Sequence, residues 1–260
     1  MIDCYTWMTD NGYKPRMMLE ETGLPHKIVP VNIREKEQMT PAFMKISPGH
    51  RIPAIVDHAG PGGATVTLCE SGAILKYLAE KSGKFYPSDP LARAKVDQWL
   101  FYGSATFTTL AQQFGHWVVR SPLKVPQAQE HYTANLRDML GILDRHLASN
   151  EYFGGAYSIA DMTMYSDVHL HGVKDVGLAD YPNLKRWHDA IEEVLDAPHV
   201  AAIDAPLGAL LVRRGEAAQQ LLKRHGRAAA RRRRIDRPHH ECPEGVGRRS
   251  KTKRVNIRRR

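Results

Sequence analysis

The chain has 260 residues, which is long enough for one or two domains with buried cores. Its formal net charge is +9, but residues 212–260 alone have a net charge of +14 and residues 1–211 one of −5. The net positive charge of the chain therefore comes from its C-terminal tail, and the rest of the chain is not basic. Three widely spaced cysteines form no CxxC pair, and no apolar stretch approaches the roughly 18 residues of a membrane span. We expect a soluble cytoplasmic protein without a signal peptide.

Residues 1–87 predict an α+β domain with the element order of a thioredoxin-like fold. Gly23 and Pro25 end its first helix, and Pro30 predicts an edge position for its second strand because proline donates no ladder hydrogen bond. The predicted elements are strand 2–6, helix 14–21, strand 28–33, strands 54–57 and 65–68 around the turn Gly60-Pro61-Gly62-Gly63, and helix 71–81.

A second, all-helical domain follows a proline-rich linker. The run Tyr86-Pro87-Ser88-Asp89-Pro90 predicts extended chain, because each proline disfavours helix at the residue before it. Long amphipathic segments then cover residues 91–118, 126–148, 158–174 and 184–195. We therefore place the domains at 1–87 and 93–206, with a linker at 88–92 and a basic tail at 207–260.

The strand opening at Ile52-Pro53 and the helix start at Glu70-Ser71 together predict a peptide-binding corner. A cis bond before Pro53 would leave the backbone of Ile52 free to pair with an extended peptide. The first N–H groups of a helix and the Ser71 hydroxyl can bind a carboxylate, and the Glu70 carboxylate can bind an ammonium group. These three recognition elements suit the small peptide glutathione.

The N-terminal run Met1–Lys14 resembles the nu-class bacterial enzymes of the glutathione transferase family, which act as glutathione-dependent disulfide reductases. The resemblance covers roughly residues 1–205. It implies an enzyme that uses glutathione as co-substrate, either for addition to an electrophile or for disulfide reduction, and that forms a homodimer. Further matching runs are Leu19-Glu20-Glu21, Ile46-Ser47-Pro48, Arg51–His58, Glu70–Leu78, Tyr157–Asp161 and Trp187-His188.

The loop Thr9-Asp10-Asn11-Gly12 holds the candidate catalytic residues. A thiol titrates near pH 8.5, so an enzyme must stabilise its thiolate with hydrogen-bond donors or a helix N-terminus. By their positions alone, Thr9 and Asn11 are better explained as helix caps than as thiolate donors. The resemblance implies that both hold the glutathione sulfur, and that Gln38 contacts the glutathione backbone. Tyr5 is the alternative thiolate-activating residue, and no cysteine lies near positions 7–12.

The second substrate is expected to lie along the first long helix of the helical domain. Phe107, Phe114 and Trp117 recur at helical spacing, which indicates either an ordinary core stripe or the wall of a pocket for an apolar co-substrate. The resemblance implies an arginine contact to a second glutathione, and His131 occupies that position here. A histidine is shorter and mostly neutral at pH 7, so a second glutathione would be held less firmly.

Two further motifs predict structure or disorder rather than catalysis. Ser158-Ile159-Ala160-Asp161 has the spacing of a capping box, and we interpret it as a folding element. The arginine-rich runs of the tail predict disorder and at most weak nucleic-acid binding, without aromatic residues to stack on bases.

His239-His240 and Cys242 lack a second ligand pair at zinc spacing, so we expect no metal. The alternative functions are a non-enzymatic glutathione-binding regulator and a nucleic-acid-associated protein.

Overall fold

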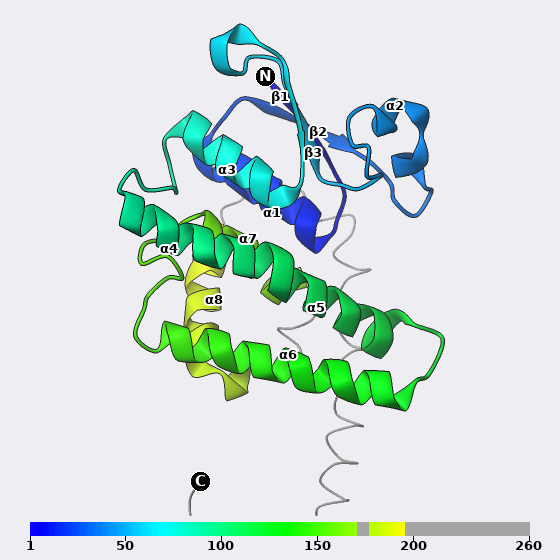
Figure 1. The fold of residues 1–260 in the computed structure, drawn as a ribbon, viewed down its shortest axis with the longest axis vertical. Coiled ribbons are helices and arrows are strands. Elements are labelled where there is room, and N and C mark those ends of the chain that lie inside the picture. Colours follow the sequence, from blue (N-terminus) through cyan, green and yellow to red (C-terminus); the bar gives the residue numbers. More distant parts are fainter. Residues whose placement is uncertain (171–176, 196–260) are drawn as a thin grey trace, which may run out of the picture. The chain divides into compact units, whose positions relative to one another are not determined.

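The computed structural model describes residues 1–170 and 177–195, and it confirms a thioredoxin-like domain followed by an all-helical domain (Figure 1). The predicted tail 207–260 and the end of the predicted helix 158–174 lie outside the described residues. Among the helices of the described part, none combines the length and the apolar character that crossing a membrane would require.

The first domain is built on a mixed four-stranded sheet with the strand order β2-β1-β3-β4. β1 pairs in parallel with β2 and antiparallel with β3, and β4 closes the hairpin with β3. β2 ends at Pro30 and is an edge strand, as predicted. The peptide bond Ile52–Pro53 is cis, also as predicted. The elements are β1 (Ile2–Thr6), α1 (Asp10–Thr22), β2 (His26–Pro30), α2 (Pro41–Met44), β3 (Ala54–Asp57), β4 (Val66–Cys69) and α3 (Ser71–Ser82).

The second domain begins earlier than the predicted boundary. The Asp89 carboxylate accepts a hydrogen bond from the Ala92 N–H at 2.8 Å, and this cap starts the next helix at Pro90. The predicted linker at 88–92 is therefore wrong at residues 90–92, which are helical. The helices are α4 (Pro90–Phe101), α5 (Thr108–Phe114), α6 (Pro126–Leu147), α7 (Ile159–Leu170) and α8 (Pro182–Leu195), with π-helical turns at Tyr102–Phe107 and Gly115–Arg120.

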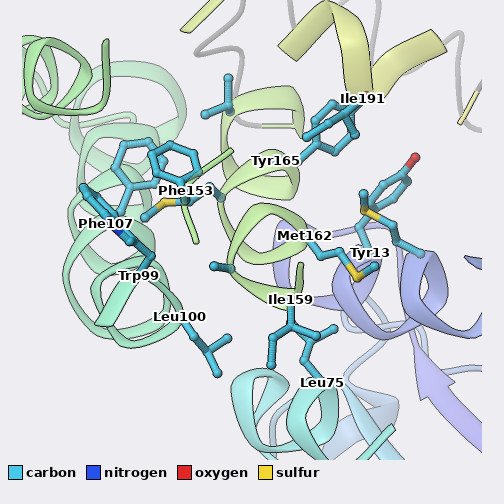
Figure 2. Close-up of a cluster of buried hydrophobic side chains, with 14 of the residues drawn as sticks. Tyr13, Leu75, Trp99, Leu100, Phe107, Phe153, Ile159, Met162, Tyr165 and Ile191 are labelled. Atoms are coloured by element: carbon cyan, nitrogen blue, oxygen red, sulfur yellow. The ribbon is translucent and has the colours of Figure 1, made fainter. Parts of the chain in front are cut away.

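α7 lies at the centre of the hydrophobic core. It contacts α1 and α3 of the first domain as well as α4 and α8 of the second. Figure 2 shows Ile159 and Met162 of α7 on the side of Leu75 and Tyr13, while Trp99, Phe107 and Phe153 cluster on its other side. One contiguous core therefore joins the two domains.

Half of the predicted capping box is present at the start of α7: the Asp161 carboxylate accepts from the Ser158 N–H, but the Asp161 N–H donates to the Ser158 carbonyl rather than to the Ser158 hydroxyl. The carboxylate also has more partners than the motif predicts. Asp161 accepts hydrogen bonds from the N–H and the hydroxyl of Ser158, from the Phe153 N–H at 3.0 Å and from the indole N–H of Trp187 at 2.9 Å. Burial raises the pKa of Asp161 to about 6, while these hydrogen bonds oppose that rise. Asp161 thus fixes both the loop before α7 and the packing of α8.

Candidate functional site

Thr9 begins α1 and is fixed in place by the helix that it caps. Its backbone is extended, and its Oγ1 accepts a hydrogen bond from the Gly12 N–H at 3.1 Å. A Cβ on Gly12 would lie only 2.2 Å from the Trp7 carbonyl oxygen, so the loop packs directly on the helix. Because Thr9 uses its oxygen as the acceptor, its hydroxyl proton can still be donated to a ligand.

Asn11 joins the start of α1 to the start of α3. Its Oδ1 accepts a hydrogen bond from the Ser71 hydroxyl at 3.3 Å and a second from the Lys14 ammonium group at 2.9 Å. The sequence predicted functions for Asn11 and Ser71 separately, and the structure brings the two side chains together. The side chain of Asn11 therefore makes site contacts, whereas the helix cap is formed by Thr9.

Lys14 is a site residue that sequence reasoning missed. Its side chain is fully buried, and its ammonium group also contacts the Thr108 hydroxyl at 2.9 Å and the Asp167 carboxylate at 3.1 Å. We call Asn11, Lys14, Thr108 and Asp167 the Lys14 network. A lysine at the start of a helix usually points into solvent. Its partners Thr108 and Asp167 lie far along the chain, so no local signal identifies Lys14 as buried.

Ile52, Glu70 and Gln38 of the predicted peptide-binding corner are placed as follows. Within the described residues, Ile52 makes no backbone hydrogen bond to the rest of the chain. Glu70 precedes α3 with φ 72° and ψ 111°, a conformation that residues with a Cβ rarely adopt, and its side chain is exposed. The Gln38 Oε1 atom is buried without a hydrogen-bond partner in the described part of the chain.

The alternative residues for thiol chemistry are placed unfavourably. Tyr5 lies within β1, where it pairs with Ala54 and packs against the ring of Phe43. Burial raises the pKa of Tyr5, and burial raises that of the Cys4 thiol to about 12. Neither group is therefore poised to ionise near neutral pH. Cys69 is half-buried on β4.

The candidate residues for the second substrate separate into two groups. Phe107 and Phe114 are 0% and 1% exposed and belong to the core, so the proposed pocket role is wrong for these two. The π-helical turn at Gly115–Arg120 ends their regular spacing. Trp117 is half-buried, and its indole N–H donates to Gln113. His131 is exposed on α6 beside Asn135, and within the described residues no contact joins it to Asn11.

One surface hollow of the described part lies away from these residues. It has a volume of about 720 Å³ and is lined by residues of the segments 79–96 and 154–158, which include none of the predicted site residues. The functional assignment therefore rests on the convergence of polar groups at the starts of α1 and α3.

Comparisons with known proteins agree with this arrangement. Family models described as "Glutathione S-transferase, N-terminal domain" and "Glutathione S-transferase, C-terminal domain" match residues 11–81 and 126–190. The chain is 37% identical over 210 residues to the disulfide-bond oxidoreductase YfcG of Escherichia coli, across 80% of this chain and 97% of that relative. It is 32% identical over 206 residues to the disulfide-bond oxidoreductase YghU, across 74% of this chain and 71% of that relative.

Two solved structures show what similar proteins bind. A glutathione transferase from Burkholderia graminis is 33% identical, superposes with a TM-score of 0.73 over 79% of this chain and 88% of its own, and holds two glutathione molecules per subunit. A glutathione transferase from Pseudomonas putida is 32% identical, with a TM-score of 0.69 over 77% of this chain and 89% of its own. That structure holds one glutathione disulfide per subunit.

Proposed function

We propose, from the premise that this chain belongs to the glutathione S-transferase family, that Thr9 and Asn11 hold the sulfur of bound glutathione as a thiolate. The protein is a glutathione-dependent enzyme related to disulfide-bond oxidoreductases. The assignment rests on the hydrogen bond between Ser71 and Asn11. This bond brings the Asn11 amide, our proposed hydrogen-bond donor to the thiolate, beside the proposed carboxylate site. The Nδ2 group of Asn11 and the Thr9 hydroxyl supply two hydrogen-bond donors for the anionic sulfur.

The rest of the glutathione molecule fits the peptide-binding corner. The backbone of Ile52, before cis-Pro53, offers an N–H and a C=O to the peptide. The N–H groups at the start of α3, beginning with that of Ser71, bind a carboxylate, because the Ser71 hydroxyl already donates to Asn11; the exposed Glu70 carboxylate binds the ammonium group. The partnerless Gln38 Oε1 can accept a hydrogen bond from the peptide backbone.

Disulfide reduction is the favoured reaction, because both Escherichia coli relatives are named for it. The bound thiolate attacks one sulfur of the substrate disulfide, forming a mixed disulfide and releasing the other sulfur as a thiolate. A second glutathione thiolate then attacks the glutathione sulfur of the mixed disulfide, which yields glutathione disulfide and the second reduced thiol. We place the second glutathione near Trp117 and His131, and conjugation to an apolar electrophile remains the alternative reaction.

Assembly and location follow as parts of the same proposal. Leu91 and Phe101 on α4 are 77% and 62% exposed, an apolar surface that a second copy of the chain would cover in a homodimer. Cys4 and Cys69 are free thiols, which suits a reducing cytoplasm.

Turnover of a model disulfide and of a model electrophile, each with glutathione, tests this function. We expect the disulfide to be reduced and the double variant Glu70→Ala, Ser71→Ala to bind glutathione at least tenfold more weakly, since the Glu70 contact to the ammonium group and the Ser71 contact to Asn11 are both lost. Calorimetry measures the affinity. Unchanged binding by the double variant would remove glutathione from this corner, and absence of turnover with both substrates would favour a non-enzymatic binding protein.

A change of Glu70 to glycine separates affinity from stability. Glycine relieves the strain of a positive φ, which costs about 1–3 kcal/mol, at a smaller cost in chain entropy. We expect Glu70→Gly to weaken glutathione binding as much as Glu70→Ala does, while its free energy of unfolding equals or exceeds that of the unmodified protein. Urea denaturation of both variants measures this difference. A glycine variant no more stable than the alanine variant would contradict the strain argument.

A further inference from the structure

The ammonium group of Lys14 is completely enclosed by acceptors. A lysine ammonium group has three donors, and in the Lys14 network it meets three acceptors: Asn11 Oδ1, Thr108 Oγ1 and Asp167 Oδ2. Its side chain and that of Asp167 are both 0% exposed. The Thr108 hydroxyl also donates to Asp167 Oδ2 at 2.5 Å. The position of the ammonium nitrogen is therefore fixed from three directions.

This contact decides which way the Asn11 amide faces. The oxygen and nitrogen of an amide are hard to distinguish by shape, but an ammonium group can only donate, so the amide atom beside it must be the oxygen. The Ser71 hydroxyl donates to the same oxygen. The two donors hold Oδ1 on the inner side of the site, and Nδ2 consequently faces away from Lys14.

We propose that Lys14 is a positioning residue for the glutathione thiolate, acting through the amide of Asn11. The inference rests on the proposed function of Asn11. Lys14 keeps the Nδ2 donor of Asn11 directed toward the sulfur, and its positive charge on the amide oxygen polarises that N–H. Thr108 and Asp167 of the helical domain hold Lys14 in turn, so the thiolate site is supported from both domains.

The test compares variants by the pH at which bound glutathione ionises, followed by the ultraviolet absorbance of the thiolate in the full-length protein. Lys14→Met alone would leave the Asp167 carboxylate buried without its ammonium partner and could unfold the chain. The double variant Lys14→Met, Asp167→Leu removes both charges, and Thr108→Val is a milder change that removes one of the three acceptors. Lys76→Met is the matched control, because Lys76 forms a partly exposed ion pair with Asp97 on α4.

We expect the double variant to raise the pKa of the bound thiol by about one pH unit, which is a tenfold fall in thiolate fraction at a pH below both pKa values, with glutathione affinity changed less than about threefold. Thr108→Val should produce a smaller rise in the same direction, and Lys76→Met none. Adding the double variant to Asn11→Ala should produce little rise beyond that of Asn11→Ala alone, since both changes act through one amide.

The proposal is overturned if the folded double variant or Thr108→Val leaves the pKa of the bound thiol unchanged, or if the effects of the double variant and Asn11→Ala are fully additive. If the double variant fails to fold, Thr108→Val is measured with and without Asn11→Ala, and this comparison decides the question. Failure of the proposed function gives a different result, because Asn11→Ala would then leave the pKa of the bound thiol unchanged by itself.

Discussion

We expect the pKa of bound glutathione to rise by about one to two pH units when Asn11 is replaced by alanine, because a hydrogen bond to a charged group contributes about 1.5–3 kcal/mol. The donor that is lost is Nδ2, which the contacts of Oδ1 with Lys14 and Ser71 direct toward the sulfur. At a pH below both pKa values, the rate of disulfide reduction is expected to fall about 10–100-fold, in proportion to the lost thiolate. Absorbance titration and initial rates measure the two effects.

Two matched variants test the same residue. Asn11→Asp keeps acceptors for Lys14 and Ser71 but replaces the donor with an anion, so it should raise the pKa of the thiol more than alanine does. Tyr5→Phe should change neither the pKa nor the rate, because the Tyr5 ring packs against Phe43. Loss of activity in Tyr5→Phe with normal activity in Asn11→Ala would assign the thiolate to the tyrosine instead.

Replacement of Asp161 with alanine should lower the free energy of unfolding by about 4 kcal/mol. The change leaves the N–H groups of Phe153, Ser158 and Trp187 buried without an acceptor, and each such loss costs about 1–3 kcal/mol. Urea denaturation near pH 7.5 measures the effect, since Asp161, with a pKa of about 6, is then ionised in the folded chain.

The stability prediction has two controls. Asp161→Asn keeps one carbonyl oxygen for Phe153 and Trp187, so it should cost about half as much as alanine. Asp189→Ala removes an acidic partner of the exposed Lys185 and should change the free energy of unfolding by less than about 1 kcal/mol. A loss below 1 kcal/mol in Asp161→Ala would show that the loop before α7 reorganises without its cap.

The parts of the fold that the sequence predicted well are those with local physical signals. Pro53, the glycine-rich turn at residues 60–63 and the Ser158-to-Asp161 spacing each act within a few residues, and all three features are present. The start of α1 was placed four residues late, at Lys14, because glycine disfavours helix and Gly12 lies in its first turn. The close packing of Gly12 on the Trp7 carbonyl is a tertiary feature that propensity does not contain.

The candidate site was predicted in its parts but not in its connections. The position of Ser71 at a helix start identifies it as a carboxylate contact, whereas the roles of Thr9 and Asn11 follow from the family resemblance, because position alone favours helix capping for both. Lys14 was missed because Thr108, its partner in the helical domain, is 94 residues away in sequence. Phe107 was proposed for a pocket because a core stripe and a ligand-binding wall have the same period, and only packing distinguishes them.

The ion pair between Lys14 and Asp167 also limits how such chains can recombine. It joins a residue inside the N-terminal family match to one inside the C-terminal match. A hybrid that combined this first half with a helical half lacking the acidic residue would bury an ammonium group without a carboxylate, at a cost of about 3–5 kcal/mol. We therefore expect a hybrid of two relatives to keep its stability only where it receives the lysine and the acidic residue together.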